Sequence, residues 1–340
     1  MRYLILLCFF SFQLIVQENI SAQEKINAQE KINVLASASM INDIAKNIVG
    51  DLGEVSSIVP IGGDPHIYEA TPRDVKKVAD ADLILINGLT FEGWITELIE
   101  NSGTAAPTIV VTEGVDVIES GKYKNSFDPH AWMNAANGVI YARNIRDALT
   151  EKYPENRPVF EANFQTYKKK LEELDSYILQ QIKTIPKNKR ILVTSHDAFA
   201  YYGKKYEINV EAIMGISTEA DARTSDVARV SKSIKESGIG AIFIESTVNP
   251  KLIKQLADDN GVSVGGELYA DSLGDAESEA STYISMLKHN TDVIVNALAK
   301  GELQKTKLDD EDNSGGIKIF IILGIVFALM LLFAMKKMNT

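Results

Sequence analysis

The fold is decided by one long helical pattern in the middle of the chain, RPVFEANFQTYKKKLEELDSYILQQIKTI, at residues 157–185. Apolar residues recur there at steps of three and four, which is the spacing of one buried helix face. They are Phe160, Phe164, Tyr167, Leu171, Leu174, Ile178 and Ile182. At ~1.5 Å per residue the predicted helix is on the order of 40 Å long, enough to run the length of a body with two lobes. A coiled coil or a partner-binding helix is the alternative interpretation, and it is weaker because strands resume at once and no heptads continue.

Short apolar strands alternate with amphipathic helices on both sides of this pattern, as is typical of α/β proteins with mainly parallel sheets. Four strands are predicted before it, at 34–37, 55–59, 83–86 and 108–111. Four more are predicted after it, at 191–194, 210–213, 241–244 and 262–264. The predicted fold class is therefore α/β, with two lobes of four-stranded, mainly parallel sheets and flanking helices, joined by the long helix.

The start of the chain is typical of a secretory signal peptide. A basic beginning precedes an apolar run at 4–10 that is too short to span a bilayer as a helix. We predict a signal peptide at 1–22, followed by a polar tether at 23–33. Cys8 is the only cysteine and lies within the predicted signal peptide. The mature chain would then hold no thiol, so a bound metal would need nitrogen and oxygen ligands.

The end of the chain is predicted to anchor the protein in the cytoplasmic membrane. An unbroken apolar run of 17 residues at 319–335 spans roughly 25 Å, near the thickness of the hydrocarbon core. An acidic linker at 301–316 precedes the predicted transmembrane helix at 317–335, and Lys336 and Lys337 follow it. The positive-inside rule then places the folded body outside the cytoplasm, in the periplasm or at the cell surface. A buried core helix is the alternative.

The net charge of −11 at pH 7 argues against a nucleic-acid partner, because nucleic acids select basic surfaces. An acidic surface is compatible with capture of a cation, although a solvated acidic face is its usual explanation. Charge therefore excludes one class of partner without identifying another.

Histidines are the main clue to function. The chain holds four of them, and two lie in repeated Asp-Pro-His tripeptides, at 64–66 and 128–130. His196 directly follows a predicted strand, whereas His289 lies in a helical pattern. Proline stiffens each Asp-Pro-His corner, and neutral imidazole is the commonest transition-metal ligand in proteins. A single histidine of this kind is more often hydrogen-bonded or solvated, but three at the ends of strands favour a metal site in the cleft between the lobes.

The second lobe is expected to supply a fourth ligand. Asp271 follows its last predicted strand and is the best carboxylate, with Asp275, Glu267 and Glu245 as rivals. Three imidazoles and one carboxylate suit Zn²⁺ and can accept Mn²⁺ or Fe²⁺. The sequence therefore predicts a site for one divalent transition-metal ion.

Five motifs follow one another along the chain. They are GGDPHIYE at 62–69, DPHAW at 128–132, SHDAF at 195–199, GISTE at 215–219 and ELYADSL at 267–273. Together they resemble the zinc and manganese solute-binding proteins of ABC importers, the cluster A-I or TroA/ZnuA-like family, over about 34–298. The resemblance implies two lobes joined by a rigid helix, with one divalent ion between them. Carried over by motif, the implied ligands are His66, His130, His196 and Asp271.

This resemblance implies a transport function and no enzymatic activity. Such a protein binds its ion with high affinity, as a monomer, and delivers it to an ABC permease and its ATPase. The implied lobes are 34–155 and 187–300, joined by a linking helix at 156–186. The chain departs from the family in having no histidine at 112–127, where many zinc members carry a His-rich loop, and no credible lipoprotein cysteine. We expect zinc more than manganese or iron, and we expect the predicted membrane helix to replace a lipid anchor.

Two rival functions remain open. One is a secreted, membrane-anchored zinc hydrolase with Glu69 or Glu245 as its base, although the chain has no His-Glu-x-x-His motif. The other is a surface adhesin in which the metal is only structural. As a further hypothesis, Asp64 and Asp128 fix the loops or orient the histidines that follow them.

Overall fold

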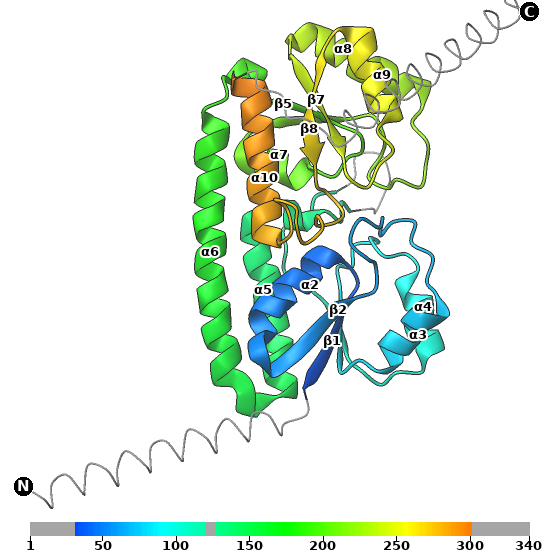
Figure 1. Ribbon diagram of the computed structural model, residues 1–340, viewed down its shortest axis with the longest axis vertical. Coiled ribbons are helices and arrows are strands. Elements are labelled where there is room, and N and C mark those ends of the chain that lie inside the picture. Colours follow the sequence, from blue (N-terminus) through cyan, green and yellow to red (C-terminus); the bar gives the residue numbers. More distant parts are fainter. Residues whose placement is uncertain (1–30, 120–126, 301–340) are drawn as a thin grey trace, which may run out of the picture.

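A single long helix forms the backbone of the molecule. The computed structural model describes residues 31–119 and 127–300. In it, α6 (Arg157–Lys183) runs along one side of the whole body (Figure 1). All seven apolar residues of the predicted stripe are buried. The helix therefore confirms the pattern, although it ends two residues earlier than predicted, and α5 (Ala135–Lys152), α10 (Tyr283–Val295) and α2 (Ser39–Val49) pack against it.

The first lobe is a parallel sheet of four strands in the order β2-β1-β3-β4. The strands are β1 (Ile32–Ala36), β2 (Gly53–Ser57), β3 (Leu83–Ile86) and β4 (Thr108–Val110). The helices between them are α2, α3 (Pro72–Ala79) and α4 (Ile95–Ser102). The four predicted strands of this half are confirmed, with ends shifted by at most two residues. Since all pairings are parallel, the carboxyl ends of the strands lie at one edge of the sheet.

The second lobe differs from the prediction of one four-stranded sheet, which is wrong. It contains two parallel sheets of two strands each, β5-β6 and β7-β8. The strands are β5 (Ile191–Thr194), β6 (Asn209–Ala212), β7 (Ala241–Glu245) and β8 (Ser263–Leu268), with α7 (Ala200–Tyr206), α8 (Thr224–Ser237) and α9 (Lys251–Asn260) around them. β5 and β7 lie side by side. They are joined by side-chain packing, because Val193 of β5 lies with Ile242 and Ile244 of β7 in one apolar cluster. No backbone ladder links these two strands in the described sheets.

The remaining helical segments among the described residues are short turns. They are the 3-10 turns at Gly50–Leu52, Ala131–Met133, Pro154–Asn156 and Lys187–Lys189, and a π turn at Asn296–Lys300. The turn at Ala131–Met133 follows His130 directly, so it belongs to the loop that carries this histidine.

The predicted fold class also included a C-terminal transmembrane helix, and this part of it needs correction. Among the helices of residues 31–119 and 127–300, none is long and apolar enough to cross a membrane. The longest, α6, is amphipathic, with exposed charges such as Lys169 and Lys170 opposite its buried stripe. The predicted anchor at 317–335 lies outside the described residues. The fold class that the structure supports is therefore α/β alone.

One large apolar cluster joins the two lobes. It contains the buried stripe of α6 together with residues of both halves, among them Val34 and Trp132 from the first, and Phe199 and Ala270 from the second. Two smaller clusters lie farther from α6, one under α3 and α4 and one under α8 and α9. Because tightly packed cores resist deformation, the parts of the lobes next to α6 behave as one body.

The first turn of α3 carries a carboxylate that stabilises the fold in a pH-dependent way. Asp74 Oδ2 accepts hydrogen bonds from Thr71 N at 3.0 Å, Thr71 Oγ1 at 2.6 Å and Tyr68 Oη at 2.9 Å, and Oδ1 lies 3.0 Å from Lys77 Nζ. Burial raises the pKa of Asp74, but these contacts outweigh it and lower the pKa to about 2. A carboxylate with a lowered pKa stabilises the folded state at neutral pH, and this contribution disappears as the pH falls from about 4 to about 2.

We therefore expect Asp74→Asn to lower the free energy of unfolding by about 2 kcal/mol at pH 7. Urea unfolding of both proteins at several pH values would measure the difference, which should shrink as the pH falls below about 4. Asp80→Asn is the control, because this exposed residue lies at the other end of the same helix. A difference that does not depend on pH would contradict the role of the Asp74 charge.

Candidate metal centre

Each predicted metal-binding side chain lies on a loop that follows the carboxyl end of a parallel strand. His66 follows β2, His130 follows β4, His196 follows β5 and Asp271 follows β8. These loops bring the four side chains together, and one donor atom of each lies within 4.8 Å of all the others. Within the described part of the chain, no other group of three or more His, Cys, Asp or Glu side chains is placed to share an ion.

The carboxylate of Asp271 lies at the middle of this group. Its Oδ2 is 3.0 Å from His196 Nε2 and 3.7 Å from His66 Nε2, while its Oδ1 is 3.4 Å from His130 Nε2. The Nε2 atoms of His66 and His130 are 3.2 Å apart. The side chain of His66 is 4% exposed and the other three are fully buried. All three histidines therefore present the same ring nitrogen to a common point that water scarcely reaches.

Two further carboxylates contact the Nδ1 atoms of two of the rings, on the side away from the common point. Asp128 Oδ1 lies 2.7 Å from His130 Nδ1, and Glu245 Oε2 lies 2.6 Å from His196 Nδ1. Each carboxylate also accepts a hydrogen bond from the backbone N of its histidine, at 2.9 Å and 2.8 Å respectively. A carboxylate at Nδ1 favours the proton on that nitrogen, which leaves the lone pair of Nε2 for an ion. Glu245, a rival ligand from the sequence, thus lies behind His196 and supports it.

The corner of His66 is built differently. Asp64 Oδ1 accepts a hydrogen bond from His66 N at 2.9 Å, so this carboxylate fixes the loop. Trp94 Nε1 donates to Pro65 O at 2.8 Å from the other side. The ring itself lies edge-on to Phe91, with 5.0 Å between centroids. His66 is therefore positioned through its backbone and an aromatic contact.

Protonation of the side chains in the site links ion binding to pH. Burial lowers the pKa of His66 to about 4, so its ring is neutral at pH 7. Burial also opposes charge on His130, but Asp128 and Asp271 outweigh it and raise the pKa to about 9. The pKa of His196 rises in the same way, because its carboxylate neighbours outweigh its burial. Burial raises the pKa of Asp271, but His196 and His130 hold it well below its usual range. A metal ion must displace protons from His130 and His196, so binding weakens in acid.

The donor set fits a divalent ion. Both oxygens of Asp271 and the Nε2 atom of His196, all of which face the common point, are buried without a hydrogen-bond partner of good geometry. Buried charged groups are costly unless they are paired or bind a metal. A cation at the common point would be coordinated by all four side chains at once.

An aromatic wall encloses the site, and the sequence analysis did not predict it. Trp132 is fully buried, with its ring 5.2 Å from that of His130 and 4.7 Å from that of Phe91. Its Nε1 donates to Ala270 O at 2.9 Å, next to Asp271. The position of Trp132, two residues after His130, was the only available signal in the sequence.

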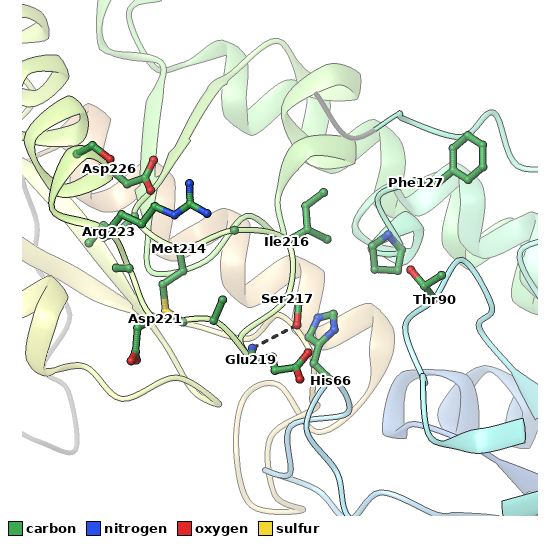
Figure 2. Close-up of a pocket in the computed structure, with 16 residues that line it drawn as sticks. His66, Thr90, Phe127, Met214, Ile216, Ser217, Glu219, Asp221, Arg223 and Asp226 are labelled. Carbon is green, nitrogen blue, oxygen red and sulfur yellow. Dashed lines mark hydrogen bonds between the residues drawn. The ribbon is translucent and has the colours of Figure 1, made fainter. Parts of the chain in front are cut away.

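A cavity of about 570 Å³ opens beside the site. The segment between β6 and α8 forms much of its lining, including Met214, Ile216 and Ser217, and His66 lies across from it (Figure 2). Among the four donors, His66 alone lines this cavity. The site is therefore closed on the side of α6 and reaches the cavity through His66.

Comparison with known proteins identifies the family. The model of the zinc-uptake complex component A, periplasmic family (ZnuA) matches residues 34–297. The chain belongs to this family. The resemblance stated from the sequence is thus confirmed, and the match covers both lobes and α6.

Several proteins are similar to this chain over most of their length. The metal ABC transporter substrate-binding lipoprotein SsaB of Streptococcus sanguinis is 38% identical, over 78% of this chain and 89% of its own. The manganese ABC transporter substrate-binding lipoprotein PsaA of Streptococcus anginosus has the same identity and coverage. The manganese-binding lipoprotein MntA of Halalkalibacterium halodurans is 35% identical over 78% of this chain and 88% of its own.

Solved structures of the family share the fold. The periplasmic zinc-binding protein TroA of Treponema pallidum has a TM-score of 0.76 and 32% identity, over 79% of this chain and all of that one. A manganese-bound S38A mutant of a periplasmic metal-binding protein from Candidatus Liberibacter asiaticus has a TM-score of 0.74, 33% identity and the same coverage. This chain is a metal ABC transporter substrate-binding protein, and the prediction that it is not an enzyme is confirmed by its family and relatives.

Proposed function

We propose that this chain captures one divalent transition-metal ion between its lobes, through His66, His130, His196 and Asp271, and delivers it to an ABC permease and its ATPase. The observation that carries the proposal is the convergence of these four buried side chains, whose donor atoms lie within 4.8 Å of one another. Three imidazole nitrogens and one carboxylate are a full tetrahedral ligand set. Four protein ligands leave no open position for a reacting water, whereas catalytic zinc uses three and keeps that position.

The place of action and the organisation of the chain follow from the family. Its description and the name of TroA both specify the periplasm, which supports an extracytoplasmic location. We assign ion capture to an N-terminal lobe at 34–155 and a C-terminal lobe at 187–300, with the linking helix at 156–186. We expect the chain to act as a monomer, since both halves of the ligand set come from one chain.

Zinc and manganese are the proposed cargoes, with iron as a third candidate. Among the relatives, PsaA and MntA are named for manganese and TroA for zinc. The present donor set has three nitrogen ligands, and such a set binds zinc more tightly than manganese. We therefore expect zinc to bind more tightly and the local supply of each metal to decide which one is carried.

The rival functions are less well supported by the geometry. For a zinc hydrolase, Glu245 would have to act as a base, but its carboxylate is held by His196 at 2.6 Å and 2.8 Å. Glu69, the other candidate base, is exposed on the surface. A purely structural metal in an adhesin would exchange very slowly, so the rate of exchange tests that alternative.

Titration calorimetry of the purified, metal-free chain with Zn²⁺ and with Mn²⁺ tests the proposal. We expect one ion per chain, and we expect His66→Ala to weaken binding about 100-fold, because it removes one of four ligands. His289→Ala is the matched control, since this fourth histidine lies in α10 against Glu279 and Tyr269. Unchanged binding in His66→Ala, or loss of binding in His289→Ala, would contradict the site.

A further inference from the structure

Two loops from opposite lobes meet at His66. Thr218, between β6 and α8, donates a hydrogen bond from Oγ1 to Asp64 Oδ2 at 2.5 Å. The other oxygen of Asp64, Oδ1, accepts the hydrogen bond from His66 N. One carboxylate thus connects the second lobe to the backbone of a metal-binding residue in the first.

The loops of the other three donors are anchored in the large apolar cluster, whereas His66 contacts it only through its ring, against Phe91. The neighbours Ala131, Ala198 and Ala270 are buried in the large apolar cluster that includes α6. Around His66, by contrast, Ile61 is 53% exposed and Ile67 is 54% exposed. An ion that leaves through the cavity must therefore displace the donor that lines it, and that donor is on the least buried of the four loops.

The loop of Asp271 is tied to the first lobe in its own right. Ser39 Oγ, at the start of α2, accepts a hydrogen bond from Leu273 N at 2.9 Å, and Trp132 Nε1 donates to Ala270 O. These contacts are buried, so Asp271 keeps its place relative to His130 when the surface loops move. The contact between Thr218 and Asp64 is instead only part-buried, and each residue lies within two positions of a residue that lines the cavity, Ser217 and His66 respectively.

We propose that Thr218 is a positioning residue that holds His66 in the site and slows the release of the bound ion. This inference rests on the proposed function. A hydroxyl that donates to a carboxylate makes a stronger bond than a neutral pair, and loss of the donor would free the Asp64–His66 corner to turn toward the cavity. A second link remains, because Gly62 N donates to Ser272 Oγ at 2.7 Å. The Asp64–His66 corner would therefore become more mobile but stay attached to the second lobe.

Rates of metal release test this role. The full chain is loaded with Zn²⁺ and mixed with an excess of a colorimetric chelator in a stopped-flow instrument. Thr218→Val keeps the shape of the side chain but cannot donate, and we expect the release rate to rise about tenfold. Thr218→Ser keeps the hydroxyl and should stay within about twofold of the wild type. Ser217→Ala is the matched control, because Ser217 Oγ is bonded within its own loop to Glu219 N (Figure 2).

Two further measurements separate positioning from damage to the site. With Co²⁺ as a probe, the absorption bands of Thr218→Val should match those of the wild type, because no ligand is lost. In an Asp64→Ala background, Thr218→Val should add less than about twofold to the release rate, since its partner is already gone. If the wild type binds zinc but Thr218→Val releases it at an unchanged rate, this inference alone is overturned. The same holds if Thr218→Ser releases zinc as fast as Thr218→Val is expected to. A wild type that binds no zinc overturns the proposed function instead.

Discussion

Replacement of Asp271 by asparagine is expected to weaken Zn²⁺ binding about 1,000-fold. The substitution keeps the shape of the side chain but removes a negative charge that faces all three imidazoles, at 3.0, 3.4 and 3.7 Å. Breaking a buried ion pair costs about 3–5 kcal/mol, and each 1.4 kcal/mol is a factor of ten in affinity. The loss should exceed that of His66→Ala, because Asp271 is fully buried at the middle of the donors.

Competition with a chelator of known affinity would measure this change. Asp275→Asn is the control, since this residue is exposed on the same loop and was a rival ligand in the sequence. The affinity of Asp275→Asn for Zn²⁺ should stay within about threefold of that of the wild type. If Asp275→Asn lost binding while Asp271→Asn kept it, the carboxylate ligand would have to be reassigned.

The second large effect is expected at Trp132. Replacement by alanine should lower the free energy of unfolding of the metal-free chain by about 3–5 kcal/mol, because it leaves a large cavity in the core. The side chain is fully buried, contacts the rings of His130 and Phe91, and donates to Ala270 O. Urea unfolding followed by circular dichroism would measure the change.

Trp132→Phe separates the contribution of the apolar contact from that of the hydrogen bond. Phenylalanine keeps most of the apolar contact but leaves Ala270 O without its donor, which should cost about 1–3 kcal/mol. The phenylalanine variant should therefore be intermediate in stability between the wild type and Trp132→Ala. A cost below about 1 kcal/mol for Trp132→Ala would show that the aromatic wall does not support the core.

Periodicity predicted the local parts of the fold well. The buried stripe of α6 was predicted residue by residue, since a helix that packs along a whole body must repeat its apolar face. The eight strands were found within a few residues of their true ends. The division of the second lobe into two sheets could not be predicted, because it depends on whether β5 and β7 share a backbone ladder or only side-chain contacts.

The candidate site was predictable where chemistry and strand ends coincide. His66 and His130 follow parallel strands of one sheet and so lie at one edge of it, while His196 follows a strand of the second lobe. The expectation that such loops meet in the cleft between lobes therefore brought all three to the same region. The supporting contacts were harder to foresee. Glu245 is 49 residues from His196, and Thr218 is 154 residues from Asp64. Such pairs depend on tertiary packing, which leaves no period in the sequence.

The donors of the site are spread over the chain from His66 to Asp271, so no short piece of it can form the site. An ion that binds only the complete native body stabilises all of it by mass action, by about 2.7 kcal/mol when free ion is at 100 times the dissociation constant. The loaded and the empty protein thus differ in how often they unfold. A protease that cleaves the unfolded chain would remove empty molecules first, and the surviving population would record the concentration of free metal around it.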